Sequence, residues 1–373
     1  VAGRYDVGGL VGRLLSGGSI TNAYASGDVV ADKNYGGLVG YFTPGAALLN
    51  SHYDMDTVTL TALSPSSSAS RTDQSNTITI GGLYGSQYET WFNGGALDGL
   101  SSQAGTYFTA DAGVYQINNV ADLKNYLGFA DQTDLNFKLT QDIDLSANSG
   151  FYIPYVAGGL NTNNRTVDSL SLSQYTSNLG LVGHFRSASD TTTSSLAVNG
   201  TIGGLTNLGL VAGSSWQRSF SNMDVSGTVA GSDLVYEKTP TNDIRDQNEN
   251  GYSNVGGLVG YAWGSSTTAL TLSNLTSSVS VTGVNNVGGL AGRIEYGAIA
   301  DSSSTGTIET VAITGVTSPK WTGGLVGSLL QSNSSLKRSF HAVGLVKGYD
   351  YVGGLVGELA GNLGELLDAN APN

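Results

Sequence analysis

Gly256-Gly257-Leu258-Val259-Gly260 is the most informative stretch of this 373-residue chain, because the same pentad recurs along it. Unchanged copies lie at Gly8–Gly12, Gly36–Gly40, Gly323–Gly327 and Gly353–Gly357, and Gly288–Gly292 has alanine in place of valine. Neighbouring copies begin 28, 32, 35 and 30 residues apart. Degenerate copies appear at Gly81–Gly85, Gly180–Gly183 and Gly203–Leu210. A repeat of about thirty residues is typical of a stacked, solenoid architecture.

Each repeat contains short runs that have the pattern of β-strands. The pentad is followed by a Gly/Ser-rich turn and then by runs such as Ser19–Tyr24 and Leu272–Leu275. These runs are short, alternate between apolar and polar residues, and are bounded by turn residues. We therefore expect three strands per repeat and an all-β fold, a right-handed parallel β-helix or β-solenoid.

The pentads supply the residues expected to hold the stack together. A unit of three short strands cannot bury its apolar side alone, but stacked units share one core. We expect each leucine to point inward and the flanking glycines to allow either close approach or a positive φ. The predicted structural residues are Gly8, Leu10, Gly12, Gly36, Leu38, Gly40, Gly256, Leu258, Gly260, Gly288, Leu290, Gly292, Gly323, Leu325, Gly327, Gly353, Leu355 and Gly357.

Composition agrees with a β-solenoid and excludes several classes of function. The chain has 54 glycines and only 12% charged residues, which suits tightly turning strands better than helices. Its net charge of −13 repels phosphate backbones and anionic lipid, so neither nucleic acid nor membrane insertion is expected. With no cysteine there are no disulfides or thiolate sites, and no apolar run is long enough to span a bilayer.

The pentads resemble the GLUG motif, the Gly-Leu-x-Gly repeat of large bacterial surface proteins. Such repeats occur in filamentous-haemagglutinin-like adhesins and in non-catalytic regions of some immunoglobulin-cleaving metallopeptidases. The resemblance extends to Asn50-Ser51-His52-Tyr53-Asp54, which looks like the end of an array, and to Leu139–Leu145, which looks like the start of another. It implies an extracellular location, on a bacterial surface or secreted, and a structural or adhesive role.

The repeats divide the chain into an expected series of segments. Residues 1–58 are the end of one array, 59–178 a connecting and capping region, 179–363 a second array with a polar insertion at 232–254, and 364–373 a tail. The connecting region carries a predicted helix at about 120–130, capped by Asn118 or Asn119 and covering the solenoid. Because residue 1 falls inside a repeat, we expect the chain to be a piece of a longer protein.

Catalytic groups are scattered, and no enzyme is expected. His52, His184 and His341 lack the spacing of a zinc site and are expected at the surface or in turns. Solenoid lyases and hydrolases of polysaccharides gather carboxylates in one groove. The candidate pairs are Asp54 with Asp56, Asp142 with Asp144, and Asp243 with Asp246. A polysaccharide-cleaving solenoid, or its glycan-binding region, is therefore the alternative function.

Calcium is the one cofactor that the residues suggest. Asp246, Asn248 and Asn250 place oxygen ligands at alternate positions before Gly251, as in the first half of a calcium loop. The glutamate that such a loop needs is replaced by Gly257. A polar hairpin tip without metal is the competing interpretation.

Aromatic residues are the main support for adhesion. The chain has 19 tyrosines, and tryptophans stand at Trp91, Trp216, Trp263 and Trp321. Exposed aromatic side chains anchor protein contacts and stack on sugars, whereas buried ones belong to the core. We expect a host or neighbouring-cell surface protein or glycan as partner, together with end-to-end self-association into fibres through uncovered strand edges. Ice binding would need a threonine ladder, and only Thr57–Thr59 and Thr77–Thr79 resemble one.

Overall fold

The structure is a computed structural model in which the chain forms two compact units. One unit comprises Val1–Ile143, Ile153–Asn161 and Val182–Arg186, and the other comprises Asp144–Tyr152, Thr162–Leu181 and Ser187–Asn373. The residues described are 1–21, 23–25, 29–43, 45–49, 51–54, 60–62, 80–83, 100–130, 132–173, 178–204, 206–231, 253–312, 319–331, 333–341 and 344–363. The fold is almost entirely β, and its parallel sheets confirm the predicted parallel β-helix. Its right-handed winding stays a prediction.

The first unit begins with an array in which each strand pairs in parallel with the strand one repeat later. The register aligns the pentads, since Gly8 lies opposite Gly36 and Val11 opposite Val39. Its strands are β1 (Ala2–Gly8), β2 (Val11–Leu14), β3 (Ser19–Thr21), β4 (Tyr24–Ala25), β5 (Val29–Gly36), β6 (Val39–Phe42), β7 (Ala47–Leu49), β8 (Ser51–Asp54), β9 (Leu60–Ala62) and β10 (Ile80–Leu83).

Helices in the first unit pack on an aromatic cluster. The predicted helix is present as α3 (Val120–Tyr126), and the Asn119 side chain caps it by accepting a hydrogen bond from the Asp122 N–H. A second helix, α2 (Leu100–Tyr107), was not predicted from sequence. The Phe137 ring lies 5.0 Å from Phe108 and 4.8 Å from Tyr126, measured between ring centres. The neighbouring strands are β11 (Ala110–Asp111), β12 (Val114–Ile117), β13 (Asn136–Leu139), β14 (Ile143–Asp144), β15 (Ile153–Val156) and β16 (Gly159–Asn161).

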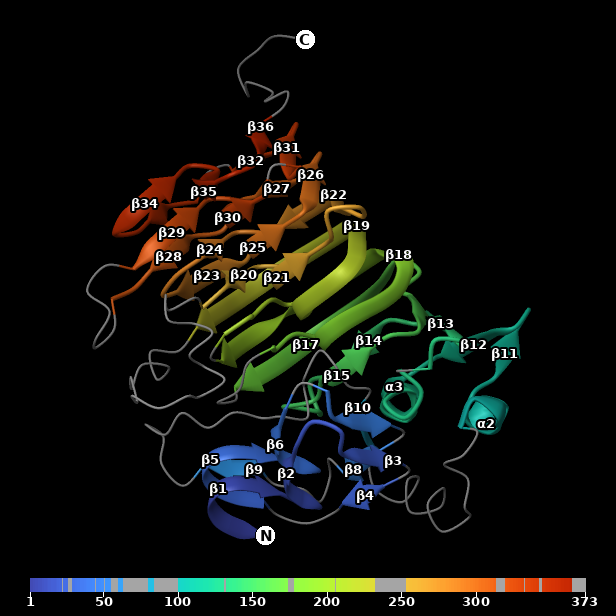
Figure 1. The fold of residues 1–373 in the computed structure, drawn as a ribbon. Helices are drawn as coiled ribbons and strands as arrows, with labels where there is room; N and C mark the ends of the chain where they lie inside the picture. The colour runs from blue at the N-terminus through green and yellow to red at the C-terminus, as the bar shows by residue number, and fades with distance from the viewer. Residues whose placement is uncertain are drawn as a thin grey trace. The chain divides into compact units, whose positions relative to one another are not determined.

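The second unit contains the long solenoid array, whose strands stack in chain order up to β36 (Figure 1). One parallel sheet holds β20 (Val255–Gly256), β24 (Val287–Gly288), β29 (Lys320–Gly323) and β34 (Asp350–Gly353). The large sheet runs through β17 (Arg165–Ser173), β18 (Val182–Gly204), β19 (Ala212–Gly231), β21 (Val259–Trp263), β22 (Leu270–Ser277), β23 (Ser280–Gly283), β25 (Ala291–Glu295), β26 (Gly297–Ala300), β27 (Ser303–Ser304), β28 (Ile308–Thr310), β30 (Val326–Leu330), β31 (Ser335–Lys337), β32 (Phe340–His341), β33 (Val346–Lys347), β35 (Val356–Leu359) and β36 (Asn362–Leu363).

A coil of this array has more strands than the three predicted. The coil that begins at Val287 contains five short strands, β24 to β28. Single residues with a positive φ separate some of them: Tyr296 lies between β25 and β26, and Asp301 between β26 and β27. Such a residue turns the chain without the Gly/Ser-rich signature of a longer turn, which is why sequence patterns merged these strands.

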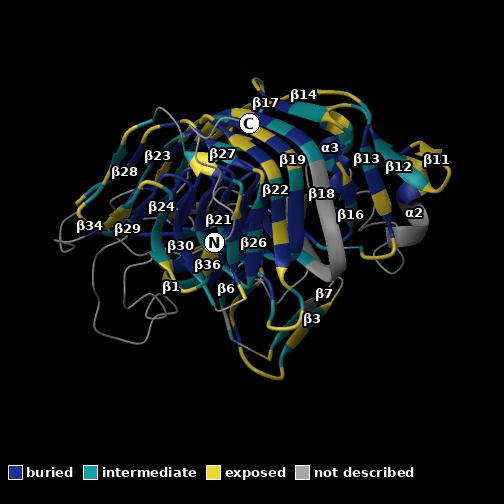
Figure 2. Ribbon diagram, turned by 90° about the horizontal axis from the view of Figure 1, so that it is seen from above, coloured by how far each residue is buried: buried dark blue, intermediate teal, exposed yellow. Residues whose placement is uncertain are grey.

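The pentad leucines of the interior coils form the predicted internal column, but the prediction was wrong for Leu10 of the first pentad, which is 46% exposed, and Leu355 of the last pentad is partly exposed. Leu258, Leu290 and Leu325 have no exposed surface, and buried residues line the strands of the array (Figure 2). The Leu258 N–H donates to the Leu290 carbonyl, and the Leu290 N–H donates to the Leu325 carbonyl. Each coil therefore receives both apolar contacts and main-chain partners from the next.

Glycine is required in the pentads because neighbouring coils approach closely. A Cβ atom at Gly257 would lie 2.3 Å from the Gly289 carbonyl oxygen, and one at Gly289 would lie 2.4 Å from that of Gly324. None of the predicted pentad glycines has a positive φ. Of the two roles expected for them, close approach is the one that the structure supports.

Some residues that the sequence assigned to the connecting region or to the polar insertion take part in the coils of the second unit. Coil pairing in the second unit already includes β17, upstream of residue 179. Residues 232–252 of the expected insertion and the tail at 364–373 lie outside the described residues. Ser253 and Asn254, the last two residues assigned to the insertion, are buried within the second unit.

Candidate functional site: the left-handed corners

A residue in the left-handed backbone conformation stands two positions before each pentad or pentad-like step for which the structure describes that position. We call this position the left-handed corner. Its occupants and φ values are Asp6 (53°), Asn34 (52°), Asn178 (58°), Asn207 (54°), Asn254 (44°), Asn286 (49°), Trp321 (65°) and Tyr351 (58°). Asparagine and aspartate tolerate this conformation better than other non-glycine residues, whereas aromatic side chains rarely adopt it.

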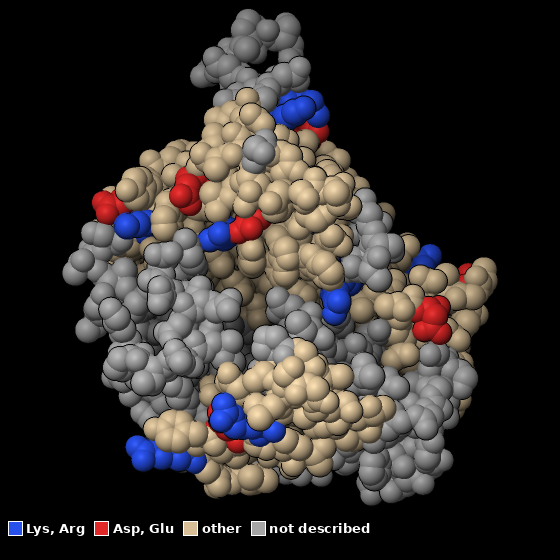
Figure 3. All heavy atoms as spheres, in the orientation of Figure 1, with Lys and Arg blue, Asp and Glu red and all other residues tan. Residues whose placement is uncertain are grey.

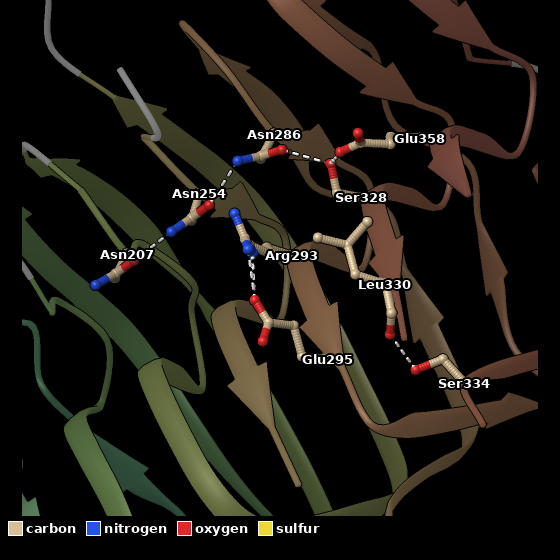
Figure 4. Close-up of polar contacts among 9 residues, drawn as sticks. All are labelled: Asn207, Asn254, Asn286, Arg293, Glu295, Ser328, Leu330, Ser334 and Glu358. Atoms are coloured by element: carbon tan, nitrogen blue, oxygen red, sulfur yellow. Dashed lines mark hydrogen bonds and ion pairs between the residues drawn. The ribbon is translucent and has the colours of Figure 1, made fainter. Parts of the chain in front are cut away.

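The asparagines at these corners form a ladder of amide hydrogen bonds. Asn207 Nδ2 donates to Asn178 Oδ1 at 2.9 Å, Asn254 Nδ2 to Asn207 Oδ1 at 2.8 Å, and Asn286 Nδ2 to Asn254 Oδ1 at 2.8 Å. Figure 4 shows the side chains of Asn207, Asn254 and Asn286 following one another across the strands. In the first unit, Asn34 Nδ2 donates to Asp6 Oδ1 at 2.8 Å. Because these amides are largely buried, the bonds satisfy groups that would otherwise be costly to bury.

The ladder changes chemistry after Asn286. The next two corners are Trp321 and Tyr351, and Asn286 Oδ1 instead accepts a hydrogen bond from the Ser328 hydroxyl on β30 of the next coil. Ser328 Oγ lies 2.5 Å from Asn286 Oδ1 and 3.0 Å from Glu358 Oε2 (Figure 4). The polar column therefore continues through Ser328 and Glu358, which leaves the corner position to the aromatic side chains.

Lys320, Trp321 and Tyr351 form a group that we call the aromatic corner. The Trp321 and Tyr351 rings are stacked, with centres 6.3 Å apart and planes at 15°. Lys320 Nζ lies 5.8 Å from the centre of the Trp321 ring and 6.0 Å from that of Tyr351. Trp321 is partly buried, whereas 61% of Tyr351 is exposed, so this corner presents aromatic surface to solvent where earlier corners bury an amide.

A second aromatic and charged group lies on the strands that follow the pentads. The Tyr261 and Trp263 rings are stacked with centres 4.7 Å apart, and the Arg293 guanidinium lies 5.8 Å from the Tyr261 ring. Arg293 Nε donates to Glu295 Oε1 at 2.8 Å (Figure 4). Burial, followed by the Glu295 carboxylate, raises the pKa of Tyr261. These partly buried side chains satisfy one another and form a structural cluster.

Comparison with known proteins supports the repeat assignment. The family model of the GLUG motif matches residues 3–30 and 283–309. The chain contains GLUG motifs. Comparison with curated protein sequences gives no match. Among solved structures, a Bacteroides ovatus protein proposed to be an immunoglobulin A1 protease is similar, with a TM-score of 0.48 and 15% identity over 69% of this chain and 75% of that chain. Similarity at this level does not bear on activity.

The two histidines whose side chains the structure describes, His184 and His341, do not form a site together. His184 was expected at the surface but is fully buried in β18, where burial and then Arg186 lower its pKa to about 3. His341 is partly buried and lies 3.2 Å from Ser304 Oγ through Nδ1 and 2.9 Å from the Gly344 carbonyl oxygen through Nε2. The strand of His52 is described but its side chain is not.

The predicted carboxylate pairs give no catalytic geometry within the described residues. Asp142 and Asp144 are both exposed, on either side of the buried Ile143. The Ser146 N–H donates to Asp144, and this bond together with the Ser146 hydroxyl lowers the pKa of Asp144. Asp56, Asp243 and Asp246 lie outside the described residues, as does the side chain of Asp54.

Metal binding has no geometric support in the part of the chain that the structure covers. No group of three or more histidine, aspartate or glutamate residues is placed to hold a metal ion there. The calcium candidate formed by Asp246, Asn248 and Asn250 lies outside the described residues and stays a prediction. Within the same limits, no helix is both long and apolar enough to cross a membrane.

The left-handed corners were missed from sequence although a signal for them was present. Asparagine or aspartate stands at the same offset before six pentad or pentad-like steps, and both residues favour the left-handed conformation. A second such column contains Asn222, Asn274, Asp301 and Arg338, with Arg338 Nε donating to Asp301 Oδ1 at 2.6 Å. Of the predicted tryptophans, Trp321 joins the aromatic corner, Trp216 and Trp263 are partly buried, and Trp91 is not described.

Proposed function

We propose that this chain is a structural and adhesive segment of an extracellular bacterial surface protein of the filamentous-haemagglutinin-like type. The observation that supports this most is the continuous coil-to-coil pairing from β19 to β36, in which leucine and glycine positions repeat. Coils that bury their apolar side chains against one another form a rigid scaffold that can be lengthened by adding copies. Such a scaffold suits a spacer that presents side chains at its corners.

The electrostatic surface is compatible with this role. Charged residues make up only 12% of the chain, and Figure 3 shows few of them on the face that it draws, several in adjacent groups of opposite sign. Lys347 Nζ, for example, lies 2.6 Å from Glu309 Oε1 on the neighbouring coil. A sparsely charged, acidic surface favours neutral or weakly charged partners over nucleic acid and anionic lipid.

End-to-end association belongs to the same proposal. On the last described coil, Val352, Leu359 and Leu363 are exposed, whereas the residues opposite them one coil earlier are fully buried: Thr322, Leu329 and Leu336. A strand edge with exposed apolar residues is a template for pairing with another chain. Negative-stain images over a range of protein concentrations are expected to show rods that lengthen as concentration rises. Rods of constant short length would contradict this part of the proposal.

Adhesion is tested directly by coating beads with the purified chain. We expect these beads to be retained on epithelial or bacterial cell surfaces above beads coated with an unrelated protein of similar acidity. Incubation with plant and bacterial polysaccharides is expected to release no reducing ends. Retention no greater than that of the control beads, combined with release of reducing ends, would favour the alternative of a polysaccharide-cleaving solenoid.

A further inference from the structure

The aromatic corner departs from the repeat at a position that asparagine occupies on the preceding coils. Four corners of the second unit carry asparagine, which suits the left-handed conformation and satisfies its amide within the ladder. Trp321 and Tyr351 occupy the same position with φ values of 65° and 58°. Side chains held in an unfavourable backbone conformation are concentrated at functional sites. Two consecutive departures, on coils that keep the pentad unchanged, indicate selection for the aromatic rings themselves.

The surroundings of the rings define the chemistry that they can recognise. Tyr351 and Tyr349 are 61% and 55% exposed, so aromatic surface is accessible. The strand register places Lys320 opposite Asp350, which supplies a hydrogen-bond donor and an acceptor of opposite charge on adjacent coils. Rings flanked by a few polar groups suit a ligand with an apolar C–H face and several hydroxyls. Because Lys320 and Asp350 balance in charge, the corner favours a neutral ligand.

We propose that the aromatic corner is a binding subsite for a neutral carbohydrate chain. A pyranose ring stacks its C–H face on the exposed aromatic surface of Tyr351, whose ring is in turn stacked with that of Trp321. Its hydroxyls accept hydrogen bonds from the Lys320 ammonium and donate to the Asp350 carboxylate. This inference rests on the proposed adhesive function, for which it names the class of ligand.

Saturation-transfer NMR of the full chain with cellohexaose, laminarihexaose and chitohexaose tests the assignment. We expect the wild-type chain to transfer saturation to the C–H protons of at least one of these oligosaccharides. The single variant Tyr351→Asn and the double variant Trp321→Asn/Tyr351→Asn are each expected to weaken its affinity at least about tenfold, a loss of ~1.4 kcal/mol. Their thermal unfolding midpoints should be unchanged or higher, because asparagine suits this backbone conformation.

Tyr296→Asn is the matched control, because Tyr296 is another tyrosine with a positive φ (53°), at a different corner of an interior coil. Its affinity for the same oligosaccharide should equal that of the wild type. Absence of saturation transfer with all three probes, or wild-type affinity in Tyr351→Asn, would overturn the inference. If coated beads adhere to cells but no oligosaccharide binds, the carbohydrate assignment fails while adhesion stands. If an oligosaccharide binds but coated beads do not adhere to cells, the adhesive function fails while the carbohydrate subsite stands.

Discussion

The coils that begin at Asn254 and Asn286 share their strand pairing with those that begin at Trp321 and Tyr351 but differ at the left-handed corner. All four carry the pentad, pair in parallel and stack their leucines in one column. At the left-handed corner, however, Asn254 and Asn286 are buried in an amide ladder, whereas Trp321 and Tyr351 stack and reach the surface. The difference indicates that the pentad maintains the stack while the residue at the left-handed corner can vary.

The largest expected effect is the loss of stability when an interior pentad leucine is replaced by alanine, compared with the same replacement in the last pentad. Leu290 is completely buried, so Leu290→Ala is expected to lower the free energy of unfolding by about 3 kcal/mol through lost burial and a residual cavity. Leu355 is partly exposed, and Leu355→Ala should cost less than about half as much. Urea unfolding monitored by circular dichroism measures both. Equal losses would show that the coils do not depend on their neighbours for a core.

Glycine substitutions offer a comparison in which a single methyl group is added. Gly289→Ala places a Cβ 2.4 Å from the Gly324 carbonyl oxygen and is expected to destabilise the chain by about 2 kcal/mol. Gly354 occupies the same position in the last pentad, where an added Cβ meets nothing within 4 Å. Gly354→Ala should therefore change the unfolding free energy by less than ~0.5 kcal/mol. A neutral Gly289→Ala would contradict the close approach of neighbouring coils.

The burial of His184 should be detectable in the pH dependence of the free energy of unfolding. His184 has its pKa lowered from 6.5 to about 3 in the folded chain, so folding favours the neutral ring. The contribution of His184 to the free energy of unfolding is therefore fully present above pH 6.5. It decreases as pH falls below that value, by about 1.4 kcal/mol for each pH unit. His184→Gln should remove this slope between about pH 6.5 and pH 5, above the carboxyl range. His341→Gln serves as the control and should keep it. An unchanged slope in His184→Gln would refute the assignment.

The smallest expected effects compare the two kinds of corner. Asn286→Ala removes the bond to Asn254 and the acceptor beside Ser328, and is expected to cost about 1 kcal/mol of unfolding free energy. Tyr351→Asn should cost nothing or stabilise the chain by up to ~1 kcal/mol, because it relieves a left-handed aromatic residue. Differential scanning calorimetry of both variants provides the test. A marked loss of stability in Tyr351→Asn would mean that the aromatic pair is part of the fold.

Sequence patterns predicted the parallel β-helix because the pentad and its approximate spacing recur along the chain. Leu258, Leu290 and Leu325 could be assigned to the core since their spacing and flanking glycines recur, and α3 was predicted from its apolar face and Asn cap. The helix α2 was missed because Ser101, Ser102 and Gly105 are weak helix formers, and tertiary packing overrides their preference.

The candidate site was less predictable because its stacking and burial depend on contacts between residues of neighbouring coils. Trp321 was singled out as an aromatic residue, but its stacking on Tyr351 depends on a register that joins residues one repeat apart. Likewise, the burial of His184 depends on strand pairing that no local pattern reports. The asparagine ladder could have been predicted, since left-handed asparagines at a fixed offset are a local signal with a known cause.

Amide hydrogen exchange measured residue by residue is the most direct test of a core shared between coils. The N–H groups of Leu258, Leu290 and Leu325 each donate to the leucine carbonyl of the next coil. We predict that these three amides exchange slowly and with one common free energy, equal to that of cooperative unfolding of the array. Exchange at three unrelated rates, each limited by local opening of its own coil, would contradict the account.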